Sequence, residues 1–348
     1  MNVALCFFVI YIHVASVVME YMDANSWKYL AAMSLWKLAS CAVPGFFFLS
    51  ALKLSLGIGK QGFSYPKYIT SRIRRVWLPY IAAAAVYLLF FLYHNYMEFD
   101  LANTVKLFLD GNMSAHFYFV VAVMQFYLLA PIWRWLAKKL EDPVFAVIAV
   151  VSSYFIGLFF GQYLVDFIYI FYKGGVFPYS DRVFTTYIFW WVLGLAAGRH
   201  YERLKATLAE HTVAVTAFFA VAAVHNVFLT YVHNSGKTWI HWLDTAHAFY
   251  VVGAILFMLA VSVRLSRKKF AECAVIRYID RSSYSIYLWH PLALYICENI
   301  TAAKLDLSPV GLLAVRTLFG FVITVSLCAA VSVAADGISK AVSKRKIK

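Results

Sequence analysis

Charged residues are scarce in this chain of 348 residues: only 14% are Asp, Glu, Lys or Arg, whereas 63% are hydrophobic. Soluble globular domains carry roughly 25% charged residues. The composition therefore excludes an ordinary soluble domain. Acidic residues are the scarcer charges, with 17 Asp and Glu against 31 Lys and Arg, so the formal net charge is +14.

Cysteines are also few, and they form no recognisable motif. The chain has five of them, an odd number, without a C-x-x-C pair, and they lie inside or beside apolar stretches: Cys6, Cys41, Cys273, Cys297 and Cys328. This pattern excludes a disulfide framework and a zinc site of the usual spacing. We expect small buried thiols and no bound metal ion.

Independent soluble domains, fixed-period repeats and a Walker phosphate loop are all absent from the sequence. No gap between apolar stretches is long enough to fold by itself, and nothing indicates a nucleoside triphosphate as ligand. The first apolar stretch lacks a basic leader and a small-residue cleavage site, so we interpret it as a retained helix. We therefore expect one membrane domain over residues 1–348.

Long apolar segments dominate what remains. Each is long enough to cross a hydrocarbon core roughly 30 Å thick as a helix. They predict an all-α, polytopic transmembrane bundle of about ten spans, at residues 2–20, 30–52, 76–95, 116–134, 143–162, 183–199, 212–232, 246–264, 283–300 and 309–334.

Lys and Arg gather in every second gap between these segments and after the last one, at residues 53–75, 134–139, 199–205, 264–281 and 340–348. An excess of Lys and Arg marks cytoplasmic loops, so both termini are predicted to be cytoplasmic. The positive charge then reflects topology and attraction to anionic membrane lipids. We expect no nucleic-acid partner, because no basic face exists outside these loops.

Three histidines lie inside or at the edge of apolar segments: His13 in the first, His116 at the start of the fourth and His290 in the ninth. Ionisable groups are costly in hydrocarbon and usually mark functional sites. A histidine can also simply bridge two helices through hydrogen bonds, and His116 can be an interfacial residue beside an aromatic belt. Lys37 and Arg316 are expected to extend toward the outer interface.

A neutral histidine in an apolar cleft can accept a proton from an attacking hydroxyl, or it can carry an acyl group itself. The sequence does not separate these roles. Glu20 lies on the same helix face as His13 and could set its tautomer, although two turns separate them by roughly 10 Å. Tyr287 lies one turn before His290.

Arg72, Arg74 and Arg75 precede the third segment. They can anchor the chain to phospholipid phosphates, or they can form a cluster for the phosphates of a cytosolic anionic donor such as a CoA thioester.

The residues resemble the acyltransferase-3 family of integral membrane acyltransferases over nearly the whole chain. Five motifs carry the resemblance in the order of the family: His13 in the first span, VPGFFFLSALKL (43–54), SRIRRVWLPY (71–80), HFYFVVAVMQFYLLAP (116–131) and SYSIYLWHP (283–291). Two positions depart from it: Asn2 replaces the basic residue that many members carry eleven positions before the first histidine, and Ala51 replaces a glycine.

The resemblance implies transfer of an acyl group, usually acetyl, from cytosolic acyl-CoA to a hydroxyl of a cell-envelope glycan or its lipid-linked precursor, at a bacterial cytoplasmic membrane. The chain looks like the short, stand-alone branch that includes surface-polysaccharide O-acyltransferases. His13 is implied as catalytic, and Arg72 and Arg75 as donor-binding.

The remaining site residues follow from this reading. We expect Arg74 to join the donor cluster, and His290 and Tyr287 to orient the acceptor or donate to the developing oxyanion. Ser50 and His116, within the second and fourth motifs, are expected to contact substrate. A transporter or flippase of a glycan or lipid is the alternative, and a membrane scaffold or sensor without a substrate is a further one.

Overall fold

The computed structural model describes residues 1–58, 62–160, 167, 179–236, 243–266, 273–304 and 307–345, with side chains omitted at 299–304 and from 333 onward. Within these ranges the ordered elements are all helical, which confirms the predicted all-α class. Parts of the predicted segments and basic clusters, among them residues 161–162, 267–269 and 346–348, lie outside the described residues. The chain divides into two compact units, Met1–Ala42 with Leu208–Lys348, and Val43–Thr207.

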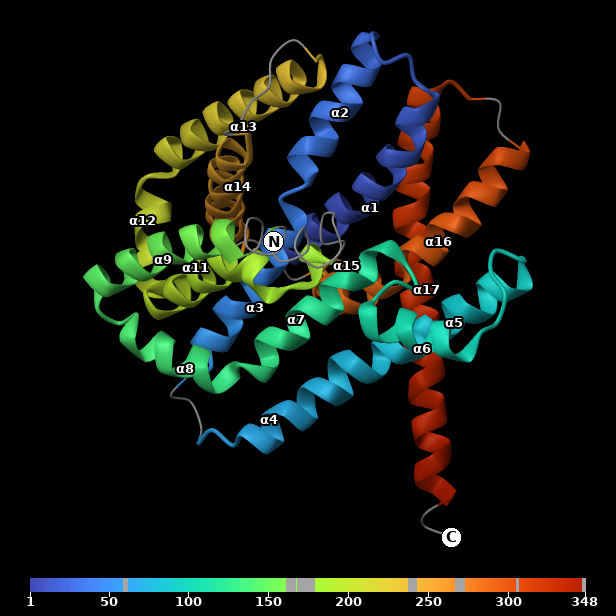
Figure 1. The fold of residues 1–348 in the computed structure, drawn as a ribbon, viewed down its shortest axis with the longest axis horizontal. Coiled ribbons are helices and arrows are strands. Elements are labelled where there is room, and N and C mark those ends of the chain that lie inside the picture. Colours follow the sequence, from blue (N-terminus) through green and yellow to red (C-terminus); the bar gives the residue numbers. More distant parts are fainter. Residues whose placement is uncertain are drawn as a thin grey trace. The chain divides into compact units, whose positions relative to one another are not determined.

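The first unit combines both ends of the chain. Its helices are α1 (Asn2–Val18), the 3-10 turn η1 (Met19–Tyr21), α2 (Trp27–Ala39), α13 (Thr212–Asn234), α14 (Leu243–Leu265), α15 (Ala274–Arg281), α16 (Ser283–Lys304) and α17 (Pro309–Arg345). α1 packs against α2, α15, α16 and α17, α13 pairs with α14, and α16 with α17 (Figure 1).

The second unit is the central part of the chain. Its elements are α3 (Ala42–Leu56), α4 (Tyr65–Arg72), the π-helical turn η2 (Ile73–Trp77), α5 (Leu78–Tyr93), α6 (Leu101–Asp110), η3 (Ala115–Phe117), α7 (Tyr118–Leu128), α8 (Ala130–Lys139), α9 (Pro143–Leu158), η5 (Ser180–Arg182), η6 (Phe184–Tyr187), α11 (Ile188–Arg199) and α12 (Tyr201–Glu210), whose last three residues belong to the first unit.

All ten predicted segments fall on helices, but fewer meet the criteria for a membrane span. Six helical stretches of the described chain are long and apolar enough, namely Asn2–Tyr21, Trp27–Leu56, Tyr65–Tyr93, Thr212–Asn234, Leu243–Leu265 and Pro309–Ser332. A seventh is the bent pair Leu101–Asp110 and Ala115–Leu128. α9, α11 and α16 are not among them. The number of ten spans and the cytoplasmic termini stay predictions.

The surface of these helices suits lipid. On α13, Val213, Val221, Val224 and Phe228 are all more than half exposed, and only 17% of this candidate span is buried. In water such a face would be a large apolar patch, which soluble monomers avoid. In hydrocarbon it is the ordinary outer surface of a multi-pass membrane protein.

One glycine pattern of the kind that binds dinucleotides does occur in the sequence, at Gly57, Gly59 and Gly62. That pattern carries meaning when it follows a strand and opens a helix. Here it follows α3, and no strand occurs among the described residues. The structural context therefore gives no indication of a dinucleotide-binding fold.

Close packing between α3 and α11 organises the second unit. Gly194 and Gly198 lie one turn apart on α11, and a Cβ atom at Gly194 would overlap the Phe48 carbonyl oxygen, while one at Gly198 would lie 2.5 Å from Ser55 Cβ. Ser55 Oγ, fully buried, donates to the Leu195 carbonyl at 2.9 Å. Small residues four apart let membrane helices approach closely, and this contact lies beside the motif that contains Ser50.

Gly194→Ala is expected to destabilise the protein by about 1–3 kcal/mol, because the new methyl group has to displace backbone of α3. Thermal unfolding of the purified protein in detergent measures the loss. Gly62→Ala is the control, since nothing lies within 4 Å of a Cβ at that glycine. Equal melting temperatures for the two variants would show that α3 and α11 are not in close contact.

Candidate active site

Two histidines from distant parts of the sequence meet inside the first unit. The ring centroids of His13 on α1 and His290 on α16 are 4.9 Å apart, with the ring planes inclined by 47°. His290 is completely buried and His13 is partly buried. The structure thus brings together two histidines that the sequence analysis named as candidate site residues.

The register of α1 against α16 follows from contacts near their first turns. Cys6 Sγ lies 3.9 Å from the Ser283 carbonyl oxygen. His13 and His290 each follow that contact by seven residues, or two helical turns, so neighbouring helices with the same rise bring them to the same level. About one turn before Cys6, Asn2 Nδ2 donates to Asp280 Oδ1 at 2.9 Å, and this hydrogen bond connects α1 to α15.

His290 is held by its own helix. Its Nδ1 lies 2.7 Å from the backbone carbonyl oxygen of Tyr287. The Tyr287 side chain is 5% exposed, and its ring centroid lies 5.9 Å from that of His290. Tyr287 therefore contributes a backbone acceptor to the site as well as the side chain that the sequence analysis singled out.

Glu20 and Ser16, which follow His13 in the sequence, are both exposed. Glu20 is exposed in η1, beyond the end of α1, so the regular spacing assumed for a continuous helix does not extend to it. Ser16 is also exposed, donates to the Ile12 carbonyl and accepts from Trp36 Nε1 at 3.0 Å. The proposed effect of Glu20 on the tautomer of His13 stays a prediction.

The basic segment of the second unit contains a pocket. Arg74 and Arg75 are exposed and line an open cavity of about 450 Å³ together with Lys67, Thr70, Ser71 and Pro66. Three cations and two hydroxyl groups around one open cavity form a donor set suited to phosphate oxygens. Sequence reasoning counted Lys67 only toward topology and missed both hydroxyl residues.

Arg72 has a different environment from Arg74 and Arg75. Its guanidinium carbon lies 4.8 Å from the ring centroids of both Tyr68 and Tyr127. The π-helical turn η2 begins immediately after Arg72 and changes the direction of the side chains that follow. Pro79, which has no amide hydrogen for the Arg75 carbonyl, provides a reason for this turn.

His116 and Ser50 both belong to the second unit. His116 is 3% exposed in η3, its Nδ1 lies 3.0 Å from Ser114 Oγ, and its ring packs against Tyr87 with centroids 5.9 Å apart. His116 is therefore packed inside the second unit, and the interfacial alternative stays open. Ser50 is half-buried on α3. Their role in substrate binding stays a prediction.

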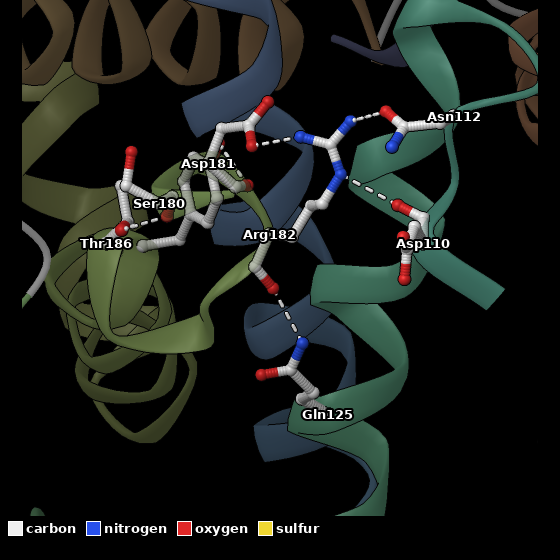
Figure 2. A network of polar contacts seen from close by, with 8 residues as sticks. Asp110, Asn112, Gln125, Ser180, Asp181, Arg182 and Thr186 are labelled. Atoms are coloured by element: carbon white, nitrogen blue, oxygen red, sulfur yellow. Dashed lines mark hydrogen bonds and ion pairs between the residues drawn. The ribbon is translucent and has the colours of Figure 1, made fainter. Parts of the chain in front are cut away.

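A polar network that the sequence analysis did not identify is centred on Arg182. Figure 2 shows its guanidinium directed at the Asp181 carboxylate, the Asn112 amide oxygen and the Asp110 carbonyl, the last at 2.7 Å from Nε. The Arg182 carbonyl in turn accepts from Gln125 Nε2 at 2.6 Å. The network joins η5 to α7 and to the turn after α6.

Arg316 has an acidic partner that the sequence analysis did not identify. It is 7% exposed, and its Nη1 lies 3.2 Å from Glu298 Oε1 on α16. The Glu298 side chain is itself 39% exposed, so the pair lies at the edge of the packed helices. The expectation that Arg316 extends toward the outer interface stays a prediction.

A large apolar cavity of about 570 Å³ lies in the first unit but does not contain the histidines. Phe7, Tyr11, Phe257, Leu313 and Thr317 are among its lining residues. Tyr11 and His13 are 200° apart on an ideal helix, so the cavity lies on the face of α1 opposite the histidine pair. The Tyr11 hydroxyl donates to the Ala32 carbonyl at 3.1 Å, which leaves an apolar lining.

Six helical stretches of the described chain are long and apolar enough to span a membrane, the first unit holds a close pair of imidazoles, and the second unit has a basic pocket. These features define a multi-pass membrane protein. The chain belongs to the acyltransferase-3 family: the family model described as an acyltransferase domain matches residues 3–333. It is thus a membrane acyltransferase, with an acyl donor and an acceptor as its substrates. No curated protein and no solved structure matches the chain.

Arg182→Ala is expected to destabilise the protein by about 1.5–3 kcal/mol, because charge-assisted hydrogen bonds to three partners are lost. Arg182→Lys retains the charge but not the planar fork, so its loss should be intermediate. Thermal unfolding in detergent measures both, with Arg203→Ala on the exposed face of α12 as control. An Arg182→Ala variant as stable as the control would contradict a structural role for the network.

Proposed function

We propose that the protein transfers an acyl group, with acetyl as the first to test, from cytosolic acyl-CoA to a hydroxyl of a cell-envelope glycan or its lipid-linked precursor. The observation that carries this proposal is the approach of His13 and His290 inside a bundle of the acyltransferase-3 family. Imidazoles in a water-poor interior are suited to move the proton of an attacking hydroxyl.

The proposed reaction moves one acyl group from the sulfur of CoA to an oxygen of the acceptor. The acceptor oxygen attacks the thioester carbonyl carbon while its proton moves to the imidazole of His13. The C–O bond forms, the C–S bond breaks, and the CoA sulfur leaves and receives the proton. His13 acting as a transient acyl carrier would divide the same balance into two steps.

The basic pocket is proposed to bind the phosphates of CoA. Lys67, Arg74 and Arg75 supply charge, and Thr70 and Ser71 supply hydroxyl donors. Arg72, stacked between two tyrosine rings, shapes the pocket by fixing α4 against α7 through Tyr127 and is given no direct phosphate contact.

The topology that goes with this function is the ten-span one, with both termini cytoplasmic, in the inner membrane of a bacterium, as a single membrane domain. The pocket lies within the gap 53–75, whose Lys and Arg predict a cytoplasmic position. A cytosolic donor reaches it there, while the acceptor glycan approaches from the outer side. Ser50 and His116 are proposed to contact substrate, and Glu20 to support His13.

His13→Ala is expected to lower acyl transfer at least about 100-fold, the range in which a positioned acid–base group contributes. Purified protein in liposomes with labelled acetyl-CoA gives the measurement, scoring hydrolysis and protein acylation as well as transfer. His225→Ala, on an exposed part of α13, is the control. A wild-type protein that neither binds nor turns over acetyl-CoA would favour a transporter and contradict an acyltransferase.

Lys67→Ala and Arg74→Ala are each expected to raise KM for acetyl-CoA about tenfold with little change in kcat, because each removes one charged contact to phosphate. Raising the ionic strength should weaken donor binding by wild type more than by these variants. Lys138→Ala on α8 serves as an exposed cation outside the pocket. Unchanged KM in both pocket variants would place the donor elsewhere.

A further inference from the structure

Pro291 lies inside α16 rather than in its first turn. A proline inside a helix has no amide hydrogen for the carbonyl four residues earlier, and its ring pushes that carbonyl away from the helix axis. The carbonyl in question belongs to Tyr287. It is the same oxygen that lies 2.7 Å from His290 Nδ1.

This geometry determines which nitrogen of His290 carries the proton. A carbonyl oxygen only accepts hydrogen bonds, so the Nδ1 atom facing it has to be the donor. In the neutral ring the proton is then on Nδ1, and Nε2 carries the lone pair. Without the proline, the amide of residue 291 would compete for the Tyr287 carbonyl as the regular helical donor.

We infer that Pro291 is a positioning residue that frees the Tyr287 carbonyl to hold His290 as the Nδ1-protonated tautomer, so that His290 presents Nε2 as a proton acceptor. Contact with substrate is assigned to His290, and Pro291 acts only through it. The inference rests on the proposed function and decides between two roles of His290.

Neutral His290 can accept at Nε2 a hydrogen bond from a second hydroxyl of the acceptor and so orient the acceptor for attack, which leaves the proton of the attacking hydroxyl to His13. It cannot donate from Nε2 to the developing oxyanion, because no proton is there. Of the two roles considered for His290, orientation of the acceptor is therefore the one that this tautomer allows. The second imidazole, His13, 4.9 Å away between ring centroids, then takes the proton of the hydroxyl.

The tautomer can be measured without any substrate. Full-length protein with 15N-labelled histidine in nanodiscs gives distinct nitrogen shifts for protonated and unprotonated ring positions, and His290→Gln identifies the His290 signals by their loss. We expect wild type to show a proton on Nδ1 and none on Nε2 at neutral pH. A proton on Nε2 of wild-type His290 would overturn the inference.

Pro291→Ala tests the role of the proline directly. It should allow the new amide to bond the Tyr287 carbonyl and produce a mixture of both tautomers. Pro143→Ala is the matched control, because Pro143 begins α9, where no carbonyl is freed by the missing amide. A Pro291→Ala variant that retains the single wild-type tautomer would contradict the inference. Should this variant fail to fold, the wild-type spectrum still decides the tautomer.

A pair of substitutions at residue 290 separates the two nitrogens in activity. An asparagine amide nitrogen reaches the position of Nδ1 and keeps the bond to Tyr287, whereas a glutamine oxygen reaches the position of Nε2 and keeps the acceptor. We expect His290→Gln to retain about tenfold more turnover of labelled acetyl-CoA than His290→Asn, the range seen when a supporting contact is lost. The reverse order would overturn the assignment of Nε2.

The proposed acyl transfer and the inference about Pro291 would be contradicted by different results. Absence of acetyl-CoA turnover by wild type contradicts the proposed function, while the nitrogen shifts of His290 still test the inference. Turnover with a proton on Nε2 supports the acyltransferase and contradicts the role given to Pro291.

Discussion

The constraint behind this structure is that a polar group inside hydrocarbon has to find its partner within the protein, because no water is available. The Tyr287 carbonyl, which Pro291 leaves without a backbone donor, accepts a hydrogen bond from His290 Nδ1 in the proposed tautomer. Arg316 takes the carboxylate of Glu298 on the neighbouring helix. In both cases the partner is close by, and the side chain is held in one orientation as a result. For the acid–base role that we propose, this restriction is an advantage, since the tautomer and direction of the imidazole are determined before a substrate arrives.

The same constraint explains how the chain divides its chemistry. The first unit buries two histidines in an apolar environment, where a neutral ring is favoured and proton transfer is effective. The second unit keeps Lys67, Arg74 and Arg75 in an open pocket, where charges stay hydrated and can exchange water for phosphate. The CoA thioester that we propose as donor has both a polyanionic end and a neutral reacting end, and the two kinds of environment match these two ends.

Local irregularities of the helices decide where the functional side chains point. The π-helical turn after Arg72 separates it from Arg74 and Arg75, although all three lie within four residues of one another. The change from α-helix to 3-10 helix after Val18 alters the direction of Glu20 relative to a continuous α-helix. Pro79 lies next to the π-helical turn, and Pro291 lies beside His290 in α16. Prolines in apolar segments thus indicate candidate sites, as charged residues do, because the carbonyls that they leave unbonded need other hydrogen-bond donors.

The amino-acid sequence by itself determined the helical class, the positions of the helices along the chain and the presence of His13 and His290 within apolar segments. It did so because apolar segment length and the cost of charge in hydrocarbon are local properties. Only the tertiary structure decided that His13 and His290 face each other, that Arg72 stacks between tyrosines, and that Arg182 and Arg316 have partners. These facts depend on the register between helices distant in sequence, set by contacts such as Cys6 with Ser283. No periodicity within one helix encodes that register.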